Sequence, residues 1–165
     1  MVDWTIQKTT KEQLKQVEEL YDHARRFMAD HGKRNQWGDT YPPTSRIVQD
    51  IEEGNSYVCM IEGRIAVVFY YRFGEDKDYQ VIEDGQWLND KPYGVVHRIA
   101  SDGRSKGGAS FCLSWALSKC GNLKIDTHPD NVVMQNLLKK NEFLYCGKIY
   151  VRDKSLRLAY QRSLL

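Results

Sequence analysis

A short glycine-rich segment carries the clearest chemical signal in the sequence. It reads DGRSKGGA over residues 102–109, between a hydrophobic strand pattern and a helical pattern. Glycines let successive backbone N–H groups turn toward one point, and the start of a helix adds unpaired N–H groups and a positive dipole end. Arg104 and Lys106 add positive charge beside them. The segment predicts a phosphate or pyrophosphate site; the alternative is a tight turn with two solvated basic side chains.

Two common nucleotide-binding patterns fit this segment poorly. No G-x-x-x-x-G-K-[ST] pattern can be aligned with it, which excludes a Walker A loop. Asp126 ends the next predicted strand, where an acidic residue could bind a ribose hydroxyl in a Rossmann or methyltransferase fold. That alternative lacks the G-x-G-x-x-G pattern, and the chain has too few strand–helix units for a doubly wound sheet.

The elements that must position the segment follow from the spacing of apolar residues. Strands are predicted at 4–9, 56–61, 64–73, 93–100, 123–126, 143–151 and 156–161, with a further short strand within 79–92. Helices are predicted from a capping box at Thr10–Gln13 to about Gly32, from Thr44 to Gly54, over 109–119, and from 127, with Pro129 in its first turn, to Lys140. The order predicts one mixed α/β domain over residues 1–165, with a mostly antiparallel sheet and one strand–helix–strand crossover.

Composition narrows the classes of protein. The 165 residues include 24 Lys plus Arg and 22 Asp plus Glu, so a net charge of +2 argues against non-specific nucleic-acid binding. The apolar run Ile65–Tyr71 is too short to span a membrane, and the first residues lack a signal-peptide pattern. Four scattered cysteines without C-x-x-C spacing favour a reduced cytoplasm, and four scattered histidines predict no metal site.

Several motifs together resemble the GNAT superfamily of acyl-CoA-dependent N-acyltransferases. RSKGGA at 104–109 is similar to the family's Q/R-x-x-G-x-G/A pyrophosphate loop, and HRIA at 97–100 resembles its fourth strand. KKNEF at 139–143 resembles the helix exit Lys-x-Gly-Phe, although Glu142 replaces the usual glycine. The element order resembles the GNAT core from end to end. The resemblance implies four or so helices around a sheet whose fourth and fifth strands splay apart.

The resemblance also implies a place for acetyl-CoA, the expected acyl donor. Pantetheine would slot between the splayed strands and bond the backbone of Ile99 and Ala100. Asn131 would contact the pantetheine arm, unless it only caps its own helix. The pyrophosphate would lie on the loop, whose expected contacts are Arg104, Lys106, Gly107, Gly108, Ala109 and Ser110.

Acyl transfer to an amine requires a base, because alkylamines have pKa values near 10.4, that of lysine. His97 is the first candidate, since it lies on the strand beside the expected thioester; the alternative is a histidine bonded to a neighbouring carbonyl. His128 is the second candidate, and Glu83 could hold a relaying water. Many family members use a tyrosine as general acid where this chain has Leu138, and Tyr145 is a possible replacement.

The acceptor is expected opposite acetyl-CoA, over the first helix pair. A polar loop there offers amides and flat aromatic rings at Asn35, Gln36, Trp37 and Tyr41. The sequence thus predicts acetyl transfer to a primary amine of a small molecule, amino acid or peptide by direct attack in a ternary complex. A CoA-binding sensor or interaction module without catalysis is the alternative, kept open by Leu138. A homodimer through an exposed sheet edge is also possible.

Overall fold

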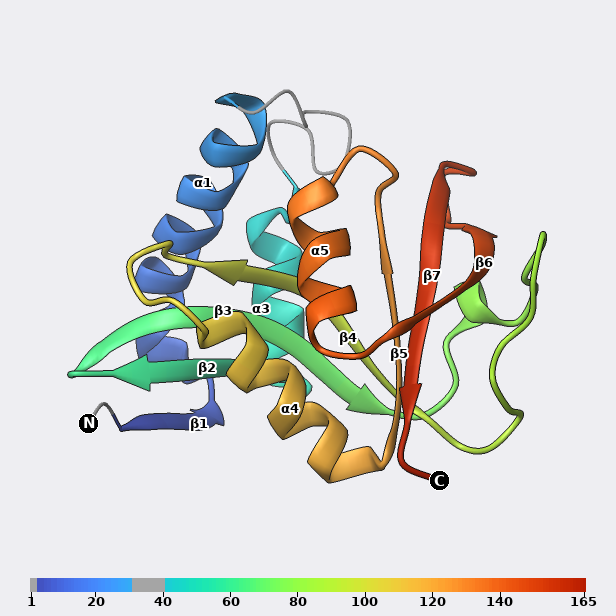
Figure 1. The fold of residues 1–165 in the computed structure, drawn as a ribbon. Coiled ribbons are helices and arrows are strands. Elements are labelled where there is room, and N and C mark those ends of the chain that lie inside the picture. The colour runs from blue at the N-terminus through green and yellow to red at the C-terminus, as the bar shows by residue number, and fades with distance from the viewer. Residues whose placement is uncertain (1–2, 31–40) are drawn as a thin grey trace. The chain divides into compact units, whose positions relative to one another are not determined.

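The structure, a computed structural model, describes residues 3–30 and 41–165, without the side chains of 28–30. These residues contain seven strands and four α-helices (Figure 1). The strands are β1 (Trp4–Lys8), β2 (Ser56–Ile61), β3 (Arg64–Phe73), β4 (Gly94–Ser101), β5 (Asn122–Thr127), β6 (Leu144–Tyr150) and β7 (Leu156–Ser163). The α-helices are α1 (Leu14–Asp30), α3 (Thr44–Glu52), α4 (Gly108–Cys120) and α5 (Val132–Lys140).

The sheet has the strand order β1-β2-β3-β4-β5-β7-β6. The pairs β1–β2, β2–β3, β5–β7 and β6–β7 are antiparallel, whereas β4 and β5 are parallel. This arrangement confirms the predicted mixed, mostly antiparallel fold class. The chain groups into two compact units, one of residues 1–71 and 98–112 and the other of residues 72–97 and 113–165, so that β4 and α4 each contribute to both.

The first unit packs an amphipathic helix on a β-meander. Val17, Leu20, Tyr21 and Ala24 recur at spacings of three and four along α1, and they are buried with residues of β2 and β3. The N-terminal end of this helix is capped as predicted, because the Gln13 side chain accepts a hydrogen bond from the Thr10 N–H at 2.9 Å. The strands β1, β2 and β3 lie side by side in Figure 1.

The second unit arranges β5, β7 and β6 side by side, as Figure 1 shows in orange to red. Residues of β5 alternate between two faces: Leu123 and Ile125 are buried on one, and Lys124 and Asp126 lie on the other. The long connection before β4 pairs with β6 through a single bridge between Glu83 and Lys148. The charged side chains of β5 therefore lie on one face of the strand.

Within the described residues the predicted helices and strands are confirmed apart from two local corrections, and the predicted end of the first helix near Gly32 lies outside those residues. The short strand expected within 79–92 is wrong; the described chain has a 3₁₀ turn at Lys77–Tyr79 and the Glu83 bridge instead. Pro129 does not lie in the first turn of a helix, because α5 begins at Val132 after the cap Asn131. Among the described helices, none has the length and apolarity needed to cross a bilayer.

Candidate active site

The glycine-rich loop after β4 has a backbone that glycine alone adopts easily. Gly103 and Gly107 have φ angles of +74° and +87°, in the left-handed region. A Cβ atom on Gly107 would lie 3.1 Å from the Trp4 ring, and one on Gly108 would lie 3.0 Å from Val67. Both the backbone conformation and the close packing explain why the sequence places glycines here.

Charged groups divide into two sets around this loop. Arg64 donates from Nε to Asp102 at 3.2 Å and also bonds Ser105, while Asp102 accepts from the Arg104 N–H at 2.9 Å. Arg104 and Lys106 are exposed, and within the described part of the chain their side chains form no hydrogen bond or ion pair. The loop is thus braced by one arginine and leaves two cations for an anion at the start of α4.

Arg98 interrupts β4 with an unusual backbone conformation. Its φ angle is +51°, which is rare for a residue with a side chain. Its guanidinium bonds both carboxylate oxygens of Asp50 at 3.0 and 3.1 Å and stacks on Tyr70 at 4.6 Å, and its carbonyl accepts from the Tyr21 hydroxyl at 2.8 Å. These partners hold the strand in this conformation immediately before Ile99 and Ala100.

The parallel pair of β4 and β5 is short. Its register joins Gly94 to Leu123 and Val95 to Lys124. Within the second unit β4 continues to His97 and β5 continues to Thr127. Beyond the two pairs above, no further residues of β4 and β5 are paired with each other in the described part of the chain. His97 and Asp126 therefore follow the segment in which β4 and β5 pair with each other, although β5 stays paired with β7 at Asp126.

His97 lies between two aspartates. Its Nε2 is 2.7 Å from Oδ2 of Asp76, and its Nδ1 is 3.9 Å from Oδ2 of Asp126. That same Asp126 oxygen accepts a hydrogen bond from the Tyr79 hydroxyl at 2.7 Å, and its other oxygen is 3.9 Å from Nε of Arg157. A titratable imidazole with ordered carboxylates on both sides is suited to accept and stabilise a proton.

Electrostatics assign distinct roles to the groups around His97. Burial alone would raise the pKa of Asp76, but the hydrogen bond and charge of His97 outweigh it and lower that pKa. Burial and the Asp126 carboxylate raise the pKa of Tyr79 well above its ordinary value. Asp76 is therefore an ionised acceptor, and Tyr79 stays a protonated donor.

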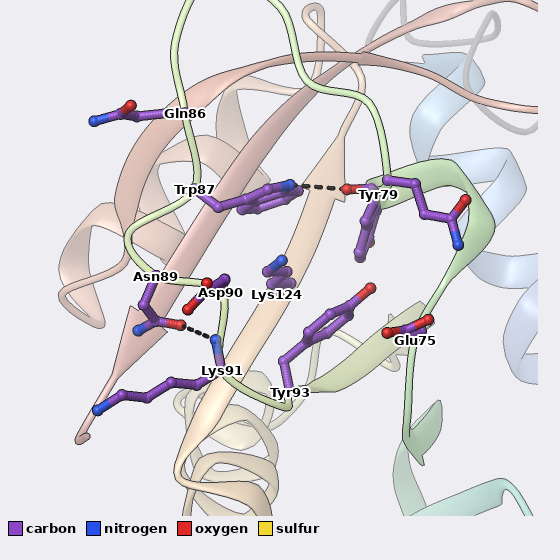
Figure 2. Close-up of a pocket in the computed structure, with 10 residues that line it drawn as sticks. Glu75, Tyr79, Gln86, Trp87, Asn89, Asp90, Lys91, Tyr93 and Lys124 are labelled. Atoms are coloured by element: carbon purple, nitrogen blue, oxygen red, sulfur yellow. Dashed lines mark hydrogen bonds between the residues drawn. The ribbon is translucent and has the colours of Figure 1, made fainter.

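A cavity of about 570 Å³ lies beside this cluster, lined in part by Tyr79. Figure 2 shows Lys124 between Trp87 and Tyr93, whose ring centroids lie 4.2 and 3.9 Å from the amine nitrogen. Trp87 donates to the Tyr79 carbonyl at 2.9 Å, which fixes the ring over the amine. Burial lowers the pKa of Lys124 to about 8.

Solved structures of similar fold place this geometry in a family. An acetyltransferase of the GNAT family from Streptococcus agalactiae 2603 is 32% identical, with a TM-score of 0.89 over 97% of this chain and 95% of that one. The chain belongs to the GNAT family of acetyltransferases. Another GNAT acetyltransferase, from Listeria monocytogenes 4b F2365, is 18% identical with a TM-score of 0.71 over 96% of this chain and 94% of that one.

A Salmonella typhimurium protein solved with its cofactor acetyl-CoA shares the fold at a TM-score of 0.65 and 14% identity, over 98% of this chain and 94% of that one. The sequence matches no protein-family model, and no curated protein matches it. The family resemblance carried by the motifs is confirmed through the streptococcal relative.

Two other predicted catalytic side chains, His128 and Tyr145, have local partners of their own. His128 Nδ1 accepts a hydrogen bond from the Asp130 N–H at 3.0 Å, and burial followed by Arg157 lowers its pKa. Tyr145 is 48% exposed on β6 and packs edge-on against Tyr160. Because β7 lies between β6 and β5, Tyr145 is two strands from β5.

Other predicted residues of the GNAT chain have mainly local partners. Glu83 is exposed and bonds Lys148 through the backbone. Asn131 Oδ1 accepts from the Met134 N–H at 3.1 Å as the cap of α5. Tyr41 is exposed, and its hydroxyl is 3.3 Å from Arg98. Asn35, Gln36 and Trp37 lie outside the described residues. Leu138, where many GNAT members carry a tyrosine, is fully buried.

Sequence reasoning missed Asp76 and Tyr79, which lie closest to the chemistry of His97. Asp76 precedes His97 by 21 residues and Tyr79 precedes Asp126 by 47. Their only signal is local: Asp76 caps a 3₁₀ turn by accepting from the Asp78 N–H. That capping role predicts a turn but not its position beside β4 and β5. Among the described residues, no group of three or more His, Cys, Asp or Glu could hold a metal ion.

Proposed function

We propose that this GNAT chain is an N-acetyltransferase that moves an acetyl group from acetyl-CoA to a primary amine of a small molecule, amino acid or peptide. The family membership supports acetyl transfer, and the fold neighbour solved with acetyl-CoA supports the donor. The observation that carries the proposal is the anion cradle after β4, where Arg104 and Lys106 are exposed beside a glycine-bearing backbone.

The residues of the loop fit the charged part of acetyl-CoA. A diphosphate needs several N–H donors and positive charge in a small space. The start of α4 at Gly108 supplies the donors, and Arg104 and Lys106 supply the charge. The backbone of Ile99 and Ala100 would bond the pantetheine arm, as in the family.

The buried Thr127 hydroxyl offers a second test of fit. It lies at the end of β5 and has no hydrogen-bond partner among the described residues. A buried polar atom without a partner costs about 1–3 kcal/mol. An amide of a bound pantetheine arm would satisfy it, and we propose Thr127 as a cofactor contact beside Asn131.

His97 would act as the base. The protonated amine gives one proton to the imidazole, and the neutral nitrogen then attacks the thioester carbonyl in a ternary complex. The new C–N bond forms as the C–S bond breaks, the nitrogen loses a second proton, and the thiolate leaves as thiol. One proton is released to solvent for each amide formed.

The buried Leu138 requires another proton donor for the thiolate. A thiol has a pKa near 8.5, so an imidazolium formed on His97 is acidic enough to return the proton. His97 would then serve both steps, with His128, a water held by Glu83, or Tyr145 as alternatives. The acceptor contacts proposed at Asn35, Gln36, Trp37 and Tyr41 complete the assignment.

A screen of primary amines with acetyl-CoA tests the function. The expected result is thermal stabilisation by acetyl-CoA, about 2.7 kcal/mol at one hundred times its Kd, and acetylated product with at least one class of amine by mass spectrometry. Stabilisation without product over the whole panel would support the non-catalytic CoA-binding module instead. Stabilisation by a methyl-donor nucleotide, and none by acetyl-CoA, would overturn the cofactor assignment.

A further inference from the structure

Three hydrogen bonds hold Asp76, two at its carboxylate and one at its backbone N–H. Oδ1 of Asp76 accepts from the Asp78 N–H at 2.9 Å, and the Asp76 N–H donates to the Tyr93 hydroxyl at 2.9 Å. The remaining oxygen, Oδ2, lies 2.7 Å from Nε2 of His97. The carboxylate therefore has little freedom to turn, and its position is set by the 3₁₀ turn at Lys77–Tyr79 rather than by β4 itself.

This contact determines which nitrogen of His97 carries the hydrogen. An ionised carboxylate can only accept hydrogen bonds, so Nε2 must be the donor at 2.7 Å. In a neutral imidazole the lone pair then lies on Nδ1, the nitrogen that faces Asp126 at 3.9 Å. Asp126 is itself held by the Tyr79 hydroxyl at 2.7 Å.

We propose that Asp76 is a positioning residue that holds His97 as the Nε2–H tautomer, so that Nδ1 takes the proton of the acceptor amine. The inference rests on the proposed function, because it assigns the geometry of the base used there. Proton uptake at Nδ1 leaves an imidazolium between the Asp76 and Asp126 carboxylates. Both charges then stabilise the protonated base, and neither aspartate has to accept the proton.

The charges around His97 favour this direction of proton flow. Carboxylates reach the ring from the segment before β4 and from β5, and Arg157 on β7 partly offsets Asp126. The Tyr79 ring lies 5.8 Å from the imidazole, and its hydroxyl is tied to Asp126. Titratable and charged groups that act on His97 or its aspartates include Arg72, Asp76, Asp78, Tyr79, Tyr93, Asp126 and Arg157.

Asp76→Asn is the decisive variant, because asparagine also caps a helical turn and keeps the size of the side chain. Its amide can donate to Nε2, which would stabilise the opposite tautomer. We expect kcat to fall roughly 10²-fold, the lower end of what a general base contributes, with an unchanged KM for acetyl-CoA. Loss of an adjacent anion also destabilises an imidazolium, so the acidic limb of the kcat/KM profile should move to lower pH.

Asp153→Asn is the matched control, since it removes the same charge from an exposed aspartate that also accepts a backbone N–H two residues along, that of Ser155 at 3.0 Å. Asp153 is no part of the proposed base, so kcat should stay close to that of the unaltered protein. Asp76→Glu is a second variant that keeps the charge but displaces it. It should lower kcat while leaving the acidic limb near its original pH, which a general loss of folding would not do.

The tautomer can be measured without any turnover. Long-range ¹H–¹⁵N correlation spectra of the protein, with His97 assigned by its absence in His97→Gln, should show the Nε2–H form above the imidazole pKa and a shift toward Nδ1–H in Asp76→Asn. An Nδ1–H tautomer in the unaltered protein overturns the inference. So does an Asp76→Asn variant with unchanged kcat and unchanged acidic limb while His97→Gln is inactive. If His97→Gln retains full activity, the proposed base is wrong, whatever the tautomer.

Discussion

Two consecutive residues of β4 each hold an aspartate, in ways that differ chemically. Arg98 bonds both oxygens of Asp50, and the side chains of this pair are only 11% and 6% exposed. His97 bonds one oxygen of Asp76, with side chains 22% and 17% exposed. Arginine stays charged at every accessible pH, whereas an imidazole exchanges its proton near pH 6.5.

The difference separates a structural charge from a reactive one. Asp50 retains its guanidinium partner, although burial raises the pKa of that carboxyl. The Arg98 pair also accompanies the strained φ of +51°, so its contacts stabilise a backbone conformation that would otherwise cost free energy. The His97 pair has a second carboxylate on its other side, and His97, unlike Arg98, has no positive φ angle. We therefore expect substitutions at His97 to affect rate, and substitutions at Arg98 to affect stability.

The largest effect is expected for His97→Gln, which keeps a hydrogen-bonding side chain but cannot accept a proton near neutral pH. Acetyl transfer should slow by roughly 10²- to 10⁴-fold, and the acidic limb of kcat/KM should disappear. Acetyl-CoA affinity, measured by calorimetry, should not change. The exposed His23→Gln controls for loss of a histidine. If His128→Gln slowed acetyl transfer more than His97→Gln, His128 would be the base instead of His97.

Arg98→Met should be the largest stability change in the comparison. It leaves Asp50 buried without its partner, and removal of one member of a buried ion pair costs about 3–5 kcal/mol. Chemical denaturation should give this decrease in the free energy of unfolding, with the acidic limb of the folded fraction unchanged.

Arg26→Met is the control for the Arg98 experiment, because Arg26 forms an exposed pair with Asp22 at 3.5 Å. Such a pair contributes at most about 1 kcal/mol. If Arg98→Met were as stable as Arg26→Met but altered the acidic limb, the separation between structural and reactive charge would fail.

Substitution of the charged residues of the glycine-rich loop should change the affinity for acetyl-CoA without changing stability. Arg104→Glu combined with Lys106→Glu should weaken acetyl-CoA binding roughly 10- to 100-fold, since each lost bond to a charged group costs about 1.5–3 kcal/mol and part of this is screened. Both side chains are exposed, so the melting temperature should hold. Gly108→Asp is a poorer test, because its Cβ would press on Val67 at 3.0 Å.

Lys139→Glu with Lys140→Glu makes the same change of charge at the end of α5 and should leave acetyl-CoA affinity close to that of the unaltered protein. Equal weakening by both double variants would show a general charge effect rather than a loop site. A shift of the acidic limb in the loop variant would mean that loop charges, and not only the aspartates, control the base.

The sequence predicted most of the fold because the signals are local. The capping box at Thr10, the hairpin of the strands 56–61 and 64–73 and the short strand at 123–126 each depend on a few residues, and each appears as expected. The segment 79–92 was predicted poorly, since a 3₁₀ turn and a single bridge carry no periodic pattern. The glycine-rich loop was located from its glycines and charges, and its binding of acetyl-CoA stays a prediction. The pairing of Asp76 with His97 was not, because tertiary packing alone brings them together.

The smallest change in stability is expected at Lys124. This residue combines features of the two compared residues, because it is buried like Arg98 but can lose its proton like His97. Burial lowers its pKa from 10.5 to about 8, while the faces of Trp87 and Tyr93 favour the charged form. Below pH 8 the folded and unfolded chains both hold the proton, so the folded state bears the whole cost of the buried charge. Between pH 8 and 10.5 the unfolded chain binds more protons, so this residue makes stability rise with pH.

Lys124→Met removes both the cost and the ring contacts. The shift corresponds to about 3 kcal/mol, and two cation–π contacts of about 1 kcal/mol each offset most of it. We expect the variant to be more stable by about 1 kcal/mol at pH 7, with the difference shrinking as pH rises toward 10.5. Urea denaturation of both proteins across this pH range measures the difference in the free energy of unfolding. The other titrating groups are the same in both proteins, so their contributions cancel in this difference. A variant less stable at pH 7 would show that the rings outweigh burial, which would make Lys124 a fixed structural charge like Arg98.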